Sequence, residues 1–246
     1  MRNRSSRLGS VLLVAAIVAV FAIGVMISGA RLGLWEPIVG FGLIRTYMNP
    51  IAYTLSGVGA FGLVVQLVTR NRAGMVKTGI TTLLGLGLLT PMIYEQTQPA
   101  ASYPPIHDIT TDTSNPPAFR VLDDNRAGAK NSLLYGGPEI TAQQNDAYPD
   151  IAPILSNKSA SKAFSEALRV GKSMGWEIVA QDPEQLRFEA TARTPVYRFV
   201  DDIVVVVSSA ADGESRIDIR SVSRIGRGDR GVNATRIREF ITAFQR

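Results

Sequence analysis

The chain has a single histidine and no cysteine, so few of its side chains could act as a nucleophile, a general base or a metal ligand. Sites with two histidine ligands, disulfides, thiolate catalysis and cysteine-bound zinc are excluded. His107 lies close in sequence to Asp108 and Asp112, and the three together could form an acid/base group or a weak metal cluster. We favour the alternative that the side chains of His107, Thr110, Thr111 and Asp112 hydrogen-bond to the backbone and hold this segment on the domain. We therefore expect no cofactor and no bound metal.

Arginines and glycines alternate in a second segment, residues 223–233, between the last predicted strand and the last predicted helix. Arginine contacts a carboxylate or phosphate through two parallel hydrogen bonds, and glycines leave backbone N–H groups open to a ligand. The N-terminus of the following helix, with Asn233 as its cap, also favours negative charge. The segment therefore predicts an anion-binding site, whose members are Arg224, Arg227, Arg230 and Asn233.

The charged residues of this region also have interpretations that need no ligand. The three arginines could pair with carboxylates and only hold the loop, and these carboxylates are Asp201, Asp202 and Asp229. Charged residues also alternate along two predicted strands, which indicates a sheet face of mixed charge: Arg187, Glu189, Arg193, Arg216, Asp218 and Arg220. We expect solvent, or part of the preceding Pro-rich segment, to cover that face.

Two short motifs match known catalytic or cofactor patterns but lie in the wrong context. Residues 57–62 follow the G-x-G-x-x-G pattern of dinucleotide sites, yet they lie inside an apolar run, where small residues allow helices to pack closely in lipid. Residues 159–162 follow the S-x-x-K pattern of penicillin-binding enzymes, but the domain is too small for that fold. Capping of a helix by Ser159 or Ser161 explains the second motif.

The elements that would position these residues begin with three apolar runs in the transmembrane region, residues 1–94. The runs cover residues 8–28, 51–68 and 79–94, and their interiors carry almost no charge. Each is close to the roughly 20 residues that a helix needs to cross a bilayer. The sequence therefore predicts three membrane helices and a lipid bilayer as the first partner.

Basic residues flank these helices unevenly. Residues 1–95 carry a net charge of +6, whereas residues 96–246 carry −1, so there is no basic domain to bind nucleic acid. No lysine or arginine occurs in residues 78–119. The flanks expected to stay in the cytoplasm are marked by Arg2, Arg4, Arg7, Arg70, Arg72 and Lys77. The positive-inside rule then predicts that the C-terminal part lies in the periplasm of a double-membraned bacterium.

Two alternatives affect this topology. Residues 1–30 resemble a cleavable signal peptide, although their apolar run exceeds the typical 7–15 residues and further spans follow. Residues 32–44 are too few to span the membrane, so we expect an interfacial or re-entrant helix anchored by Trp35 and Tyr47. If they formed a fourth span, the C-terminal domain would be cytoplasmic.

The rest of the chain reads as an α+β domain. Residues 95–158 hold eight of the 13 prolines and predict an extended arm, with a polar, mobile loop at 123–147. In residues 159–246 the periodicity predicts a helix, four antiparallel strands and a closing helix. The closing helix should cover one sheet face, as in helix-grip-like domains.

Several separated motifs in residues 100–246 resemble one family in the same order. They are the segments 107–111, 115–117, 148–149, 190–192, 201–202, 216–221, 223–226 and 229–233. Together they look like the uncharacterised bacterial family known as domain of unknown function 1499. The resemblance implies membrane-attached or exported proteins and brings no established activity.

These observations favour a non-enzymatic protein of the bacterial inner membrane. We expect its periplasmic domain to bind an envelope protein, a lipid headgroup or another anionic ligand. One alternative is a hydrolase-type enzyme centred on His107, with Asp108 or Asp112. The other is a structural protein whose membrane helices form a homo-oligomer through their small residues.

Overall fold

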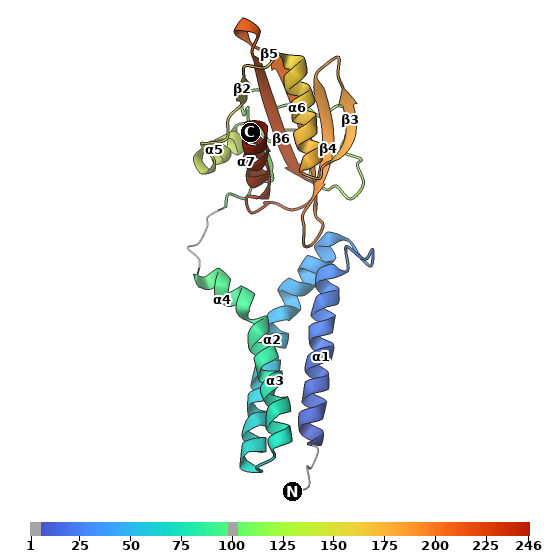
Figure 1. Cartoon of the computed structure of the whole chain (residues 1–246), viewed down its shortest axis with the longest axis vertical. Coiled ribbons are helices and arrows are strands. Elements are labelled where there is room, and N and C mark those ends of the chain that lie inside the picture. Colours follow the sequence, from blue (N-terminus) through green and yellow to red (C-terminus); the bar gives the residue numbers. More distant parts are fainter. Residues whose placement is uncertain (1–5, 98–102) are drawn as a thin grey trace. The chain divides into compact units, whose positions relative to one another are not determined.

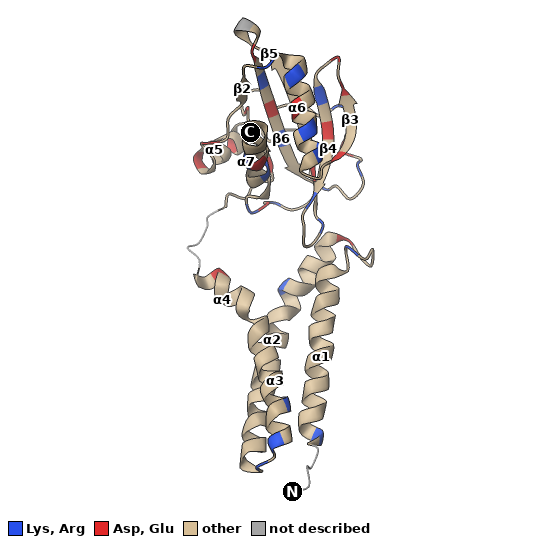
Figure 2. Ribbon diagram, in the orientation of Figure 1, with Lys and Arg blue, Asp and Glu red and all other residues tan. Residues whose placement is uncertain are grey.

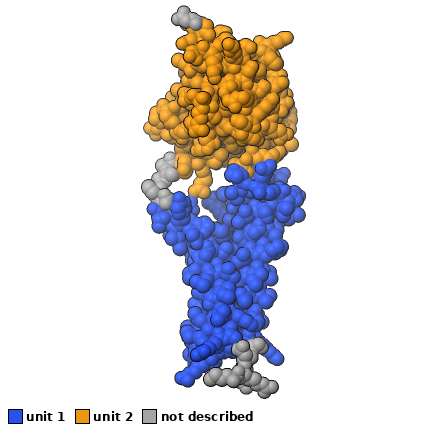
Figure 3. All heavy atoms as spheres, viewed as in Figure 1, with its two compact units in different colours: residues 1–101, 195–198 blue, residues 102–194, 199–246 orange. Residues whose placement is uncertain are grey.

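The computed structural model describes residues 6–97 and 103–246 (Figure 1). The chain divides into two compact units, which are coloured separately in Figure 3. The first unit comprises residues 1–101 and 195–198, and the second comprises residues 102–194 and 199–246. The Pro-rich segment from residue 102 onward and the α+β elements that follow it therefore belong to the second unit, which we call the α+β domain.

The first unit consists of helices with few charged residues (Figure 2). Three helical stretches are long and apolar enough to cross a membrane, in agreement with the predicted number. The third stretch, Arg72–Thr97, comprises two helices, α3 and α4. The helices are α1 (Arg7–Ser28), α2 (Pro37–Val68), α3 (Arg72–Leu88) and α4 (Thr90–Thr97).

Helix α2 corrects the expectation for residues 32–44. The helix begins at Pro37 and continues without interruption to Val68, so residues 37–44 extend the second predicted span. In the described part of the chain they form neither a separate re-entrant helix nor a fourth span. The sequence pattern failed here because Arg45 and Pro50 suggest a boundary, whereas the helix runs through both.

Glycines allow the helices of the first unit to approach closely. A Cβ atom added to Gly59 would lie 2.7 Å from the backbone nitrogen of Thr82, and one added to Gly85 would contact the backbone nitrogen of Ser56. Other glycines of the unit have nothing within 4 Å of such an atom, among them Gly57, Gly79 and Gly87. Within the 57–62 motif, Gly59 and Gly62 thus serve helix packing inside the unit, whereas Gly57 does not.

The α+β domain contains six strands rather than the predicted four. The four predicted strands are the longer ones, β3 (Glu177–Asp182), β4 (Arg187–Arg193), β5 (Val200–Ser209) and β6 (Ser215–Ser223). Two short strands from the Pro-rich segment, β1 (Asp108–Thr110) and β2 (Ile154–Ser156), pair with opposite ends of β6. The sheet is antiparallel, with the order β1-β6-β5-β4-β3. Three residues show too little alternation to predict a strand, which explains why β1 and β2 were missed.

Helices α6 (Ala160–Ser173) and α7 (Val232–Phe244) cover one face of this sheet, as predicted for the closing helix (Figure 1). The core lies between them and the sheet. Trp176 stacks on Phe240 with ring centroids 5.3 Å apart, and Phe164 meets Phe188 edge to face at 6.3 Å. Burial of these aromatic and branched side chains supplies the main driving force for folding the domain.

The opposite face of the sheet carries the alternating charged residues. Three of them, Arg187, Glu189 and Arg220, are buried, because residues 111–135, which we call the strap, cross that face. Of the two expected covers, solvent or the Pro-rich segment, the structure shows the Pro-rich segment. The strap continues into a helix, α5 (Gly137–Ala147), in a region predicted to be loop. Few apolar residues mark α5, so its helical period was not visible in the sequence.

Helix α5 supplies one unusual contact to the edge of the sheet. The side-chain amide of Gln144, which is 1% exposed, bonds both main-chain groups of Thr110 in β1. The Thr110 N–H donates to Oε1 over 3.0 Å, and Nε2 donates to the Thr110 carbonyl over 2.7 Å. Gln144 therefore satisfies the edge of β1 as a neighbouring strand would.

Candidate functional site

The charged sheet face is built around a buried ion pair between β1 and β6. Arg220 donates to both carboxylate oxygens of Asp108, over 2.9 Å and 2.6 Å, and the two side chains are 2% and 7% exposed. The remaining donors of Arg220 bond the carbonyls of Pro117 and Leu133 in the strap. Its guanidinium also lies over the rings of Phe119 and Tyr135. Nε, Nη1 and Nη2 of this arginine are thus all hydrogen-bonded, and two aromatic rings pack on its guanidinium.

A second charged group is formed by Glu189 and Arg187 on β4. The Glu189 carboxylate is 2% exposed and accepts the backbone N–H groups of strap residues 120, 121 and 122 over 2.6–3.2 Å. Arg187 donates to the same carboxylate over 3.2 Å and to the Ala118 carbonyl over 2.6 Å. Burial, together with the charge of nearby Arg120, lowers the pKa of Arg187. The charged side chains of Glu189 and Arg187 thus bind backbone groups of the strap.

A third group surrounds Asp202 on β5, which is fully buried. Arg224 contacts its carboxylate through Nε and Nη2 at 2.8–3.1 Å, and Arg126 of the strap donates to the same carboxylate. Arg224 also donates to the Ala127 carbonyl over 2.7 Å. One of the three arginines predicted to bind an anion is therefore engaged in an internal pair, as the interpretation without a ligand proposed for it.

A fourth group holds the start of α7. Arg236 donates to Asp201 over 2.5 Å, and burial raises the pKa of Asp201 against the opposing charge of Arg236. Asn233 bonds the side chains of Ser221 and Ser223 and the carbonyl of His107. The predicted cap, Asn233, is thus fully buried inside the helix start rather than capping it.

Asp229 performs the capping that the sequence assigned to Asn233. Its carboxylate accepts the backbone N–H of Gly231 over 2.9 Å and that of Asn233 over 2.7 Å. A carboxylate at this position satisfies free helix donors and suits the positive end of the helix. The Asp229 carboxylate therefore binds backbone N–H groups at the start of α7.

The structure does not assemble the acid/base group considered around His107. The His107 ring is half-buried, and its Nδ1 lies 3.3 Å from the Arg227 carbonyl. Asp108 is held by Arg220, whereas Asp112 binds Arg216 over 2.5 Å and caps the turn at residues 114–115. Within residues 6–97 and 103–246, no three His, Asp or Glu side chains are placed to hold a metal ion.

The remaining two arginines, Arg227 and Arg230, lie on a stretch of the loop with several positive φ angles, part of which packs on Tyr103 and Pro105. Gly226 and Gly231 have φ angles of 102° and 80°, and Arg230 has a φ of 55°, so this loop turns through the left-handed region three times. The Arg227 side chain is exposed, and in the described part of the chain it has no ion-pair partner. Arg227 is therefore the clearest cation that the 223–233 loop offers to a ligand.

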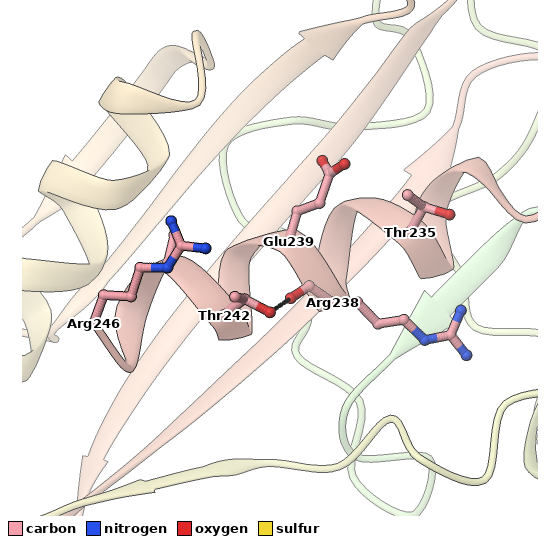
Figure 4. Close-up of a pocket in the computed structure, with 6 residues that line it drawn as sticks. Thr235, Arg238, Glu239, Thr242 and Arg246 are labelled. Carbon is pink, nitrogen blue, oxygen red and sulfur yellow. Dashed lines mark hydrogen bonds between the residues drawn. The ribbon is translucent and has the colours of Figure 1, made fainter.

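Two surface cavities lie elsewhere on the domain. One, of about 350 Å³, lies along the exposed side of α7 between Thr235 and Arg246 (Figure 4). Its Arg238 is fixed by Asp150, with both hydrogen bonds at 2.6 Å. The other, of about 390 Å³, lies where the strap meets the turn between β3 and β4. Neither is lined by His107.

Sequence reasoning found the mixed charge of the sheet face but missed its partners. It did not predict that Arg126 or Arg236 would neutralise buried aspartates. The spacing of charges two residues apart on β4 and β6 was the available signal, because alternate strand residues share a face. Nothing in the sequence indicated which strap groups would meet that face.

Fold and site together define a small α+β domain with a buried charged layer, carried by a chain with three apolar helices. A family model described as "Protein of unknown function (DUF1499)" matches residues 108–244, and the chain belongs to this family. The resemblance seen in the sequence motifs is thereby confirmed. No curated protein matches the chain.

Proposed function

We propose that this chain is a non-enzymatic protein of the bacterial inner membrane whose α+β domain lies in the periplasm. The domain binds an envelope protein, a lipid headgroup or another anionic ligand through the 223–233 loop. The observation that carries the binding proposal is the exposed Arg227 side chain, which lies between Gly226 and Gly228 and has no ion-pair partner among the described residues. Arginine on such a loop offers paired donors to a carboxylate or phosphate.

The arrangement of basic residues in the first unit supports the proposed orientation. Lys77 Nζ donates to Ser10 Oγ over 2.8 Å, and a Cβ atom on Gly9 would lie 3.2 Å from the Gly74 carbonyl. The start of α1 and the connection from α2 to α3 therefore lie at the same end of the unit. Arg7, Arg70, Arg72 and Lys77 collect there, which by the positive-inside rule favours the cytoplasmic side for that end.

The absence of an assembled catalytic group supports binding over catalysis. The carboxylates nearest to His107 in sequence are committed to arginine pairs, and the histidine ring contacts a backbone carbonyl. General acid/base catalysis needs a second group within hydrogen-bonding reach of the first or of the substrate. Among the described residues, no carboxylate bonds the His107 ring. The hydrolase alternative therefore has no supporting geometry.

Labelling of single cysteines tests the orientation, and the chain has no native cysteine to interfere. We expect Ala152→Cys, on an exposed loop of the α+β domain, to react with a membrane-impermeant maleimide in cells whose outer membrane has been permeabilised. We expect Arg72→Cys, at the start of α3, to react only after the inner membrane is opened. The reverse pattern would move the domain to the cytoplasm and refute the periplasmic proposal.

Binding of a headgroup mimic tests the role of Arg227. In the full chain reconstituted in zwitterionic nanodiscs, we expect Arg227→Ala to weaken glycerol 3-phosphate binding about tenfold, because one charge-assisted contact is lost. Arg169→Ala is the matched control, since Arg169 is exposed on α6 and pairs only with Glu166. Titration calorimetry with inorganic phosphate alongside distinguishes a headgroup from a free phosphate. Equal affinities of the two variants would contradict the assignment of this loop.

A further inference from the structure

The strap is held on the charged sheet face mainly through its backbone. Carbonyls of three strap residues, Pro117, Ala118 and Ala127, accept hydrogen bonds from Arg220, Arg187 and Arg224 over 2.6–3.2 Å. The N–H groups of residues 120–122 donate to Glu189, and those of residues 130 and 131 donate to the Arg224 carbonyl over 2.8–2.9 Å. Contacts of this kind do not depend on the side chains of the bound segment.

The side chains of the strap mostly point away from the face. Val121 is 61% exposed and Leu134 is 84% exposed, although both lie in segments whose backbone is bound. The strap side chains that contact the face include Arg126, which pairs with Asp202, Asp112, which pairs with Arg216, and Thr111, which donates to Asp218 over 3.2 Å. A cavity of about 390 Å³ runs beside Arg120 and Val121 and is lined by Arg187 and Glu189. The strap is thus attached mainly by polar contacts, which water could replace, together with the rings of Phe119 and Tyr135 on Arg220.

The face beneath the strap neutralises its own charges. Arg220 pairs with Asp108, Arg224 with Asp202, and Arg187 with Glu189, and every member of these pairs lies outside the strap. Removal of the strap would therefore leave a balanced polar surface and not an apolar one. A polar surface tolerates water, whereas a large exposed apolar patch does not. Such a face suits a site that opens from time to time.

We propose that the charged sheet face is a binding surface for an extended polypeptide, and that the strap occupies it in cis as an internal ligand. The face contacts the partner through its backbone: arginines take the carbonyls and Glu189 takes successive N–H groups. A partner segment binds only while the strap is lifted, so the apparent affinity equals the intrinsic affinity multiplied by the fraction of time that the strap is lifted. This surface shares Arg224 with the 223–233 loop but does not include Arg227, and its use does not depend on the side of the membrane that the domain faces.

Hydrogen exchange of the full chain in nanodiscs tests whether the strap opens on its own. We expect the amides of residues 120–122 to exchange about 100-fold faster than those of Val204 and Val205, which are buried in β5. Arg126→Ala should accelerate the strap amides by a further factor of about ten, since Asp202 keeps its pair with Arg224 and the sheet stays intact. Arg169→Ala is again the control. Identical exchange of strap and β5 amides would show that the strap opens only on unfolding and would overturn the proposal.

A peptide in trans tests binding directly. The probe is a fluorescein-labelled peptide with the sequence of residues 117–135, added to the same nanodisc preparation. We expect Arg126→Ala to bind it about tenfold more tightly than the unmodified chain, because the internal ligand is released more often. A probe with alanine at Val121 and Leu134 should bind equally, since those side chains face solvent. Absence of saturable binding to Arg126→Ala would refute the proposal without affecting the headgroup result.

Discussion

Replacement of Asp108 with alanine should destabilise the α+β domain by about 3–5 kcal/mol, because it leaves the Arg220 charge buried without a partner. The pair is almost fully shielded from solvent, and both of its hydrogen bonds are lost together. The two strap carbonyls bound by Arg220 cannot substitute for a carboxylate. The measurement is the free energy of unfolding of the full chain in detergent, followed by the near-ultraviolet signal of Trp176 and its neighbours.

A matched control separates burial from loss of an ion pair. Asp150→Ala also removes an aspartate held by two hydrogen bonds from one arginine, but these side chains are 55% and 41% exposed. We expect that change to cost no more than about 1 kcal/mol. The double variant Asp108→Ala/Arg220→Met should recover part of the loss, because no charge is then stranded. Similar effects of Asp108→Ala and Asp150→Ala would show that the charged layer is open to water.

The second large effect is expected in the first unit, where Gly85→Leu should destabilise the helix bundle by about 3 kcal/mol through overpacking. A Cβ atom at Gly85 would meet the backbone nitrogen and hydroxyl of Ser56, and it would lie 3.0 Å from the Ala52 carbonyl. Backbone on α2 cannot rotate away as a flexible side chain could, so α3 must move. Unfolding in a denaturing-detergent titration measures the loss.

Gly87→Leu is the control, since the same helix and the same substitution are used two residues further on. Nothing lies within 4 Å of a Cβ atom at Gly87, so stability should change by less than about 0.5 kcal/mol. The comparison of Gly85→Leu with Gly87→Leu also tests the alternative that the membrane helices form a homo-oligomer. Crosslinked oligomers that disappear in Gly87→Leu would identify the open glycines as contacts between copies. Equal destabilisation by both substitutions would contradict the helix packing described above.

The sequence was sufficient for the long elements because each has a signal that repeats. Three apolar runs predicted three helices, and alternation predicted strands β3–β6. The sequence pattern did not predict the elements whose structure depends on tertiary contacts. Strands β1 and β2 have three residues each and form because β6 offers unpaired edges at both ends. Helix α5 is polar and is fixed by the contact of Gln144 with Thr110.

The candidate sites were predictable in composition but not in pairing. The sequence predicted that the arginines of the 223–233 loop would bind an anion. In the structure the Arg224 side chain turns inward to Asp202, while the Arg227 side chain stays exposed. Both arginines lie in the same Gly-rich sequence context, so local pattern could not separate them. The strap was equally unpredictable, because backbone groups of residues 117–131 carry its contacts and every sequence has those groups.

The contact between Gln144 and Thr110 has a consequence for neighbouring copies of this protein. Chains confined to one bilayer meet far more often than chains free in solution, and an open sheet edge would let them join strand to strand. At Thr110 the amide of Gln144 already fills both hydrogen-bonding positions that an incoming strand would need. The buried Gln144 side chain thus prevents a strand from another copy from pairing with the sheet at Thr110.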